Sequence, residues 1–144
     1  MSSFAAIRER LSPGYCLALL GVAAAMYWST LPGEPPVEVR SVSVEDARML
    51  IAGGALVVDV RIPDQAIREH VPGARLIPLE SLADDLPRMG AAARERTVVV
   101  YCGTGRGRGE EATALLQKAG FSKAVNLETG FEGWRAAGLP TARG

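Results

Sequence analysis

The sequence predicts an α/β fold: a mostly parallel sheet of about five strands with helices on both faces. From residue 37 onward, short β-branched runs alternate with segments of helical pattern, which implies right-handed crossovers between parallel strands. Two of the runs, residues 55–60 and 97–101, are almost wholly apolar, as expected for strands covered on both sides. The chain has 144 residues, 48% of them hydrophobic, which suits one domain with its own core.

The elements follow in order along the chain. We expect strands at residues 37–42, 55–60, 75–77, 97–101 and 124–127. We expect helices at residues 44–52, in a short piece that begins at Pro63, and at residues 80–89, 109–119 and 129–137. Ser43 is a good cap for the first helix, and Gly120 ends the helix at 109–119.

An apolar segment precedes this domain. Residues 15–31 carry no charge, follow Arg8 and Arg10, and lead into a Pro-rich linker at residues 32–36. A membrane span needs about 17 to 25 such residues, so we expect one N-terminal apolar helix that serves as a transmembrane anchor. The positive-inside rule then leaves residues 1–14 in the cytoplasm and residues 37–144 on the extracytoplasmic (periplasmic) side. The alternative is a signal segment whose cleavage gives a secreted or periplasmic protein.

Charge and composition narrow the choice of partners. Sixteen Lys and Arg balance sixteen Asp and Glu, so no overall positive field attracts a nucleic acid, and we expect none as a partner. Two cysteines are too few for a disulfide scaffold. His70 is the only histidine, and we interpret it as a turn residue rather than a ligand. We therefore expect no metal and no cofactor.

The residues that indicate chemistry follow the strand at 97–101. Cys102 opens a loop with the sequence CGTGRGRG, which leads into a helix. Glycines allow successive backbone N–H groups to form a concave nest for an anion, and the helix adds the positive end of its dipole. Arg106 and Arg108 add permanent positive charge. Such surroundings favour the thiolate, so we expect Cys102 to be a nucleophile.

Several further motifs occur in a fixed order around this loop. They are LVVDVR at 56–61, HVPGA at 70–74, VVYC at 99–102, AGF at 119–121, NLE at 126–128, GFEGW at 130–134 and GLP at 138–140. Together they resemble the rhodanese domain, over about residues 37–140. The resemblance implies a three-layer fold and a sulfurtransferase in which Cys102 accepts a sulfane sulfur as a persulfide. The donor would be thiosulfate or a similar small sulfur-containing anion, and the acceptor a thiophilic group such as cyanide or a thiol.

The resemblance also assigns the remaining site residues. Cys102 would be catalytic, and the anion would be bound by Gly103, Thr104, Gly105, Arg106, Gly107 and Arg108. Asp59 would tie neighbouring loops together by hydrogen bonds, and Arg61 would lie near the rim of the site. Phe131 and Trp134 have helical spacing and are expected in the core.

One departure leaves two alternatives open. Five residues separate Cys102 from Arg108, one more than in typical sulfurtransferases of this family. That spacing is similar to the loop of rhodanese-fold phosphatases and arsenate reductases, in which the closing arginine clamps a tetrahedral oxyanion. Tyr101 stands where those phosphatases usually have histidine, and Glu110 or Glu111 would have to supply the acid. The second alternative is a rhodanese-like binding module without catalysis.

Overall fold

The computed structural model describes Val22, Met26 and residues 37–144, and the chain separates into residues 1–36 and residues 37–144. The expected anchor at 15–31, apart from Val22 and Met26, lies outside the described residues, as do residues 1–14 and 32–36. Among the helices that the structure does describe, none is long and apolar enough to cross a bilayer. The following account concerns residues 37–144.

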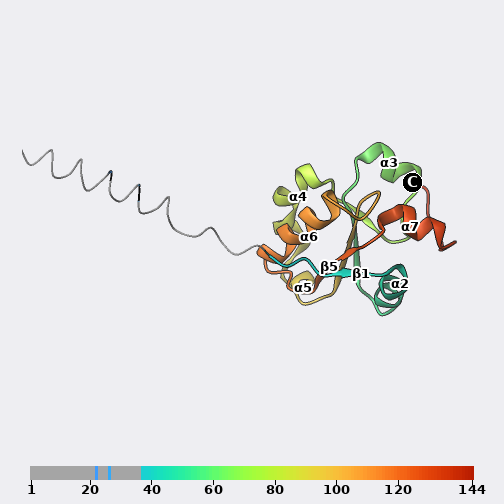
Figure 1. Cartoon of the computed structure of the whole chain (residues 1–144), viewed down its shortest axis with the longest axis horizontal. Coiled ribbons are helices and arrows are strands. Elements are labelled where there is room, and N and C mark those ends of the chain that lie inside the picture. Colours follow the sequence, from blue (N-terminus) through green and yellow to red (C-terminus); the bar gives the residue numbers. More distant parts are fainter. Residues whose placement is uncertain (1–21, 23–25, 27–36) are drawn as a thin grey trace, which may run out of the picture. The chain divides into compact units, whose positions relative to one another are not determined.

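A five-stranded sheet forms the centre of the domain (Figure 1). Its strands are β1 (Ser41–Val42), β2 (Leu56–Asp59), β3 (Arg75–Leu76), β4 (Val98–Tyr101) and β5 (Ala124–Leu127). They lie in the order β1-β5-β4-β2-β3, and every neighbouring pair is parallel. The expectation of a parallel five-stranded sheet is confirmed. Because all strands run the same way, their carboxyl ends share one edge, where ligand sites form in open α/β sheets.

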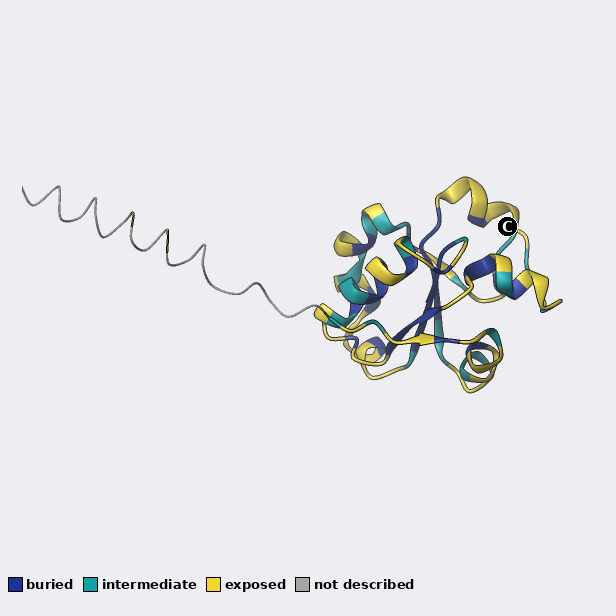
Figure 2. Ribbon diagram, viewed as in Figure 1, coloured by how far each residue is buried: buried dark blue, intermediate teal, exposed yellow. Residues whose placement is uncertain are grey.

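Helices cover both faces of this sheet. They are α2 (Val44–Ala52), α3 (Pro63–Arg68), α4 (Leu79–Asp85), the 3₁₀ helix η1 (Leu86–Met89), α5 (Ala91–Arg94), α6 (Arg108–Lys118) and α7 (Gly130–Ala136). One core joins the sheet to α4, η1, α5 and α6, and a second joins it to α2 and α7. The three central strands β2, β4 and β5 are almost wholly buried between the two helical layers, whereas the edge strands β1 and β3 have exposed residues (Figure 2). The three-layer arrangement is therefore as expected.

Strand β4 shows how the sequence builds both cores. Successive side chains of a strand point to opposite faces, so Val98 and Val100 enter the core under α6, while Val99 and Tyr101 enter the core under α7. All four are buried, which explains the continuous apolar run in the sequence. Burying each valine contributes about 1.5 kcal/mol or more. The same alternation directs Cys102 toward α6.

Three elements differ from expectation. β1 has two residues instead of six, because only Ser41 and Val42 pair with β5 at the edge of the sheet. The helix expected at 80–89 divides into α4 and η1, since Pro87 lacks the N–H that an α-helix would need there. The short helix α5 was not expected at all. The other strands and helices lie within a few residues of their expected positions.

Candidate active site

Cys102 follows the last residue of β4 at the carboxyl edge of the sheet. Cys102 is only 3% exposed. Its thiol donates a hydrogen bond to the backbone oxygen of Arg106, with 3.4 Å between Sγ and the oxygen. Cys102 is a free cysteine. The loop from Gly103 to Gly107 therefore curls around the sulfur, and α6 begins at Arg108 immediately after it.

Two backbone carbonyl groups at the start of this loop accept hydrogen bonds from residues outside it. The Cys102 oxygen accepts the N–H of Phe131 at 2.8 Å, and the Gly103 oxygen accepts the N–H of Glu132 at 2.9 Å, both from the first turn of α7. The backbone N–H groups of residues 103–106 donate to no acceptor in the described part of the chain. Unpaired N–H groups in a glycine-rich loop are what an anion-binding nest requires.

Two glycines allow the loop to lie directly on the β5–α7 connection. Gly105 has a φ of +78°, and a Cβ there would overlap the carbonyl oxygens of Leu127 and Glu128. Gly130 has a φ of +57°, and a Cβ there would overlap the backbone nitrogen of Gly105. Glycine is required at both positions by the backbone angle and by the close approach.

Asn126 is a site residue that sequence reasoning missed. It is 1% exposed on β5, and its Nδ2 donates to the Gly105 oxygen at 2.7 Å and to the Ser41 hydroxyl at 3.2 Å. Its Oδ1 is buried and has no partner among the described residues. A Cβ on Gly109 would lie 2.5 Å from this oxygen and 3.4 Å from Cys102 Sγ. The signals in the sequence were a polar residue within an otherwise apolar strand and the place of Asn126 in the NLE motif at 126–128.

Arg106 in the loop and Arg108 directly after it have different surroundings. The side chain of Arg106 is exposed. Arg108 donates from Nη1 to Glu80 at 2.7 Å, and from Nη2 to Glu80 at 2.9 Å and to the backbone oxygen of Val60 at 3.1 Å. The hydrogen bond from Arg108 lowers the pKa of Glu80 to about 2. Arg108 is thus held by residues outside the loop.

The acids that follow the loop have surroundings of their own. The Glu110 carboxylate accepts the N–H of Gly107 at 3.1 Å and so caps the start of α6. This bond engages one loop N–H that would otherwise be free for an anion. Glu111 is exposed on the same helix. Thr104, the remaining predicted anion-binding residue, is also exposed.

Asp59 and Arg61 lie on the opposite face of the sheet from Cys102. Both are buried, and Arg61 donates from Nη2 to the Asp59 carboxylate at 2.6 Å and to the Glu69 backbone oxygen at 2.7 Å. The Tyr101 hydroxyl also donates to Asp59, at 2.8 Å, and accepts the N–H of Val71 at 3.1 Å. Burial, and then the Asp59 charge, raise the pKa of Tyr101. These bonds join the ends of β2 and β4 to the neighbouring loop.

A cleft between α3 and α7 reaches the loop from this side. It has a volume of about 320 Å³ and touches the loop at Gly103. Its other lining residues are Arg61, Gln65, Arg68, Glu69, Phe131, Glu132 and Arg135. The Arg61 guanidinium lies over the Phe131 ring, 4.1 Å from its centre. Arg61 and the loop residue Gly103 therefore line the same cleft.

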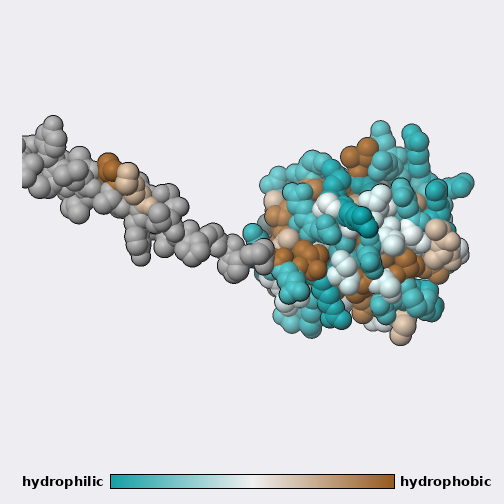
Figure 3. All heavy atoms as spheres, viewed as in Figure 1, coloured by the Kyte–Doolittle hydropathy of each residue, from teal (hydrophilic) through white to brown (hydrophobic). Residues whose placement is uncertain are grey.

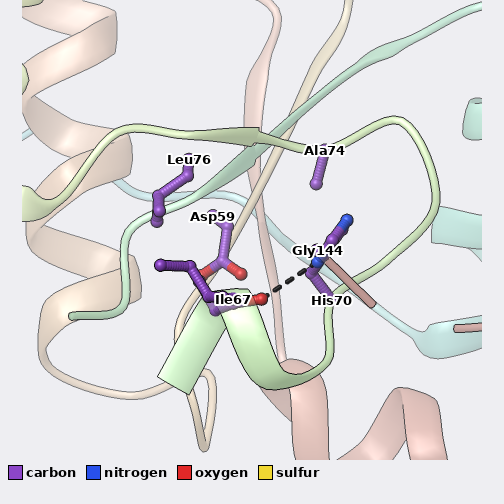
Figure 4. Close-up of a pocket in the computed structure, with 7 residues that line it drawn as sticks. Asp59, Ile67, His70, Ala74, Leu76 and Gly144 are labelled. Carbon is purple, nitrogen blue, oxygen red and sulfur yellow. Dashed lines mark hydrogen bonds between the residues drawn. The ribbon is translucent and has the colours of Figure 1, made fainter. Parts of the chain in front are cut away.

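A separate pocket of about 200 Å³ is lined in part by Asp59 (Figure 4). Apolar side chains, among them Ile67 and Leu76, line it together with His70. The His70 ring contacts the Ala66 oxygen through Nδ1 at 2.9 Å, and its backbone pairs with Ala142. This pocket shares no lining residue with the cleft at the loop, so the two are distinct.

Phe131 and Trp134 are buried on α7, as expected. Within the part of the chain that the structure describes, no group of three or more His, Cys, Asp or Glu residues is placed to hold a metal ion.

Comparisons with known proteins show what the chain is similar to. The rhodanese-like domain family matches residues 43–137. Thiosulfate sulfurtransferase GlpE of Ectopseudomonas mendocina is 34% identical over 99 residues, which are 69% of this chain and 87% of that protein. The human single-domain sulfurtransferase TSTD1 superposes with a TM-score of 0.60 at 29% identity, covering 69% of this chain and 97% of the human one.

A third relative is similar over a smaller part of its length. The probable adenylyltransferase/sulfurtransferase MoeZ of Mycobacterium tuberculosis is 43% identical over 77 residues, which are 54% of this chain. The match spans 19% of MoeZ. It therefore concerns one part of that protein and not its whole activity.

Proposed function

Because the chain belongs to the rhodanese-like family, we propose that it is a sulfurtransferase that carries sulfane sulfur as a persulfide on Cys102. The observation that carries the proposal is the position of the Cys102 thiol. It lies in a loop whose N–H groups at residues 103–106 are free of partners in the described domain. A persulfide is an anion, and such a loop stabilises the negative charge on its outer sulfur.

The reaction is a double displacement. The Cys102 thiolate attacks the sulfane sulfur of thiosulfate; the S–S bond of the donor breaks, and sulfite leaves with the bonding electrons. The outer sulfur is then attacked by a thiophilic acceptor such as cyanide, which departs as thiocyanate and returns Cys102 to the thiolate. No external oxidant or reductant is needed. Thiosulfate as donor, and cyanide or a thiol as acceptor, are the substrates proposed.

The experiment is thiosulfate:cyanide sulfur transfer by the purified full-length chain, followed as thiocyanate. We expect turnover by the wild-type protein and none by Cys102→Ser, because serine cannot carry the sulfur. Cys16→Ser is the matched control and should retain turnover, since Cys16 lies in the apolar segment and not in the domain. Turnover by Cys102→Ser would refute the mechanism. No turnover by the wild type with any sulfane donor would favour the non-catalytic binding module.

The phosphatase or arsenate reductase alternative depends on Arg108 as a clamp for the oxyanion. In this structure both Nη atoms of Arg108 are bound to Glu80 and Val60. This arrangement supports sulfur transfer over oxyanion chemistry, because the loop offers N–H groups without an arginine across it. The proposed reaction needs only those N–H groups and the thiol.

The proposal extends to location: residues 15–31 tether the domain to a membrane, with the domain on the extracytoplasmic side. Membrane fractionation with a carbonate wash tests it. The full chain should stay in the pellet, and a variant without residues 15–31 should move to the soluble fraction. A soluble chain cleaved after the apolar segment would instead indicate a signal peptide. A soluble, uncleaved chain would contradict both.

A further inference from the structure

Arg108 lies beside the loop that begins at Cys102. It is the first residue of α6, directly after the loop, and it contacts the oxygen of Val60. The Val60 N–H in turn donates to the Tyr101 oxygen at 3.0 Å, so Val60 lies beside the end of β4, next to Cys102. The pKa of Arg108 is raised mainly by Glu80, and in smaller part by the charges of Cys102 and Glu111. Through Val60, the guanidinium lies beside the strand end that leads into Cys102.

Glu80 keeps this guanidinium at the edge of the loop. Its two carboxylate oxygens bind the two Nη atoms of Arg108 in a fork-to-fork arrangement, at 2.7 and 2.9 Å. Glu80 belongs to α4, not to the loop, and it precedes Arg108 by 28 positions in the sequence. The two Nη atoms thus make three hydrogen bonds, which hold the guanidinium against Glu80 and the Val60 oxygen.

The ion pair between Arg108 and Glu80 is weak, so removing the charge of Glu80 is enough to break it. The side chains of Arg108 and Glu80 are 38% and 63% exposed, and exposed pairs contribute little to stability. Titration does not release the pair near neutral pH, because the pKa of Glu80 is lowered to about 2 by its bond to Arg108. Only a competing anion or a substitution at position 80 would free the arginine.

We propose that Glu80 is a specificity-determining residue that withholds Arg108 from the Cys102 loop and so disfavours tetrahedral oxyanions such as phosphate. The loop has the spacing that would let Arg108 clamp an oxyanion, but the ion pair with Glu80 holds the Arg108 side chain away from that position. This inference rests on the proposed function, because it concerns which anion the same loop accepts.

The test measures protection of Cys102 from alkylation by iodoacetamide as inorganic phosphate is added to the full-length protein. Peptide mass spectrometry follows Cys102 separately from Cys16. We expect Glu80→Gln to need about three- to fivefold less phosphate for half-protection than the wild type, because the guanidinium released from an exposed pair adds charge-assisted hydrogen bonds to the anion. The double variant Glu80→Gln with Arg108→Ala should lose the whole gain. Glu80→Ala is a second release variant and should behave like Glu80→Gln.

Glu111→Gln is the matched control. It removes an equal charge near Arg108 and leaves the pair with Glu80 intact. A gain in Glu111→Gln equal to that in Glu80→Gln would overturn the proposal, as would unchanged protection in both Glu80 variants or a gain that survives without Arg108. Thiocyanate formation by the wild type is measured in parallel. Because alkylation needs no turnover, failure of sulfur transfer and failure of this inference are separate results.

Discussion

At the scale of single residues, neighbouring positions at the end of β4 serve different purposes. Tyr101 is paired in register with Asp59 of β2 and lies in the core under α7. Cys102, one residue later, lies in the core under α6. Alternation along a strand explains the separation. A structural role for Asp59 could be predicted from its place at a strand end, but its partner Tyr101 could not, because the sequence does not reveal the register between β2 and β4.

Removing the Tyr101 hydroxyl should destabilise the domain. In Tyr101→Phe, the buried Val71 N–H loses its acceptor and the Asp59 carboxylate loses a donor. We expect the free energy of unfolding to fall by about 1–3 kcal/mol, the usual cost of leaving buried polar groups unpaired. Urea unfolding at neutral pH measures this change. An unchanged midpoint would show that the bond network does not stabilise the fold.

Comparing the wild type with Tyr101→Phe also tests how the free energy of unfolding depends on pH. Burial and the Asp59 charge raise the pKa of Tyr101 in the folded state, so the folded protein keeps this proton after the unfolded chain has lost it. The contribution to stability is complete below the ordinary tyrosine pKa of about 10 and is lost as the pH rises through the folded value. Between these limits the wild-type free energy of unfolding should fall more steeply with pH than that of Tyr101→Phe. Equal slopes would contradict this assignment.

At the scale of elements, the loop at 102–107 depends on how it lies against α7 and β5. The sequence predicted an anion nest from the spacing of its glycines. It did not indicate which glycine is needed for close approach, because the neighbouring carbonyls belong to the β5–α7 connection more than twenty residues later. The contribution of Asn126, which binds the loop through the Gly105 oxygen, was hidden for the same reason.

Gly105 and Gly73 form a matched pair for testing this close approach. Their φ angles are +78° and +77°, but a Cβ at Gly73 would meet no atom within 4 Å, whereas one at Gly105 would overlap backbone oxygens. Gly73→Ala should cost about 1–2 kcal/mol from backbone strain alone. Gly105→Ala should cost about 1–3 kcal/mol more and also reduce sulfur transfer. Urea unfolding and the thiocyanate assay measure both effects, and equal losses in the two variants would refute the steric explanation.

At the scale of the whole molecule, the two cores explain why apolar β-branched runs alternate with helical patterns along the sequence. Apolar side chains fill both sides of the sheet, and the face of the domain seen in Figure 3 is largely hydrophilic with separate hydrophobic patches. Strand order could be anticipated only as parallel with crossovers, since β1 pairs with β5 from the far end of the chain. The neutral net charge did exclude bulk attraction to nucleic acid, but the charges that matter at the site are local: Arg106 exposed, and Arg108 held by Glu80.

The most direct test of the account is the mass of Cys102 after the full-length protein has been incubated with thiosulfate. Peptide mass spectrometry should show a gain of one sulfur atom at Cys102 and none at Cys16. Addition of cyanide should remove that sulfur and release one thiocyanate per Cys102. An unmodified Cys102 in protein that still forms thiocyanate, or sulfur carried on Cys16 instead, would contradict the persulfide mechanism.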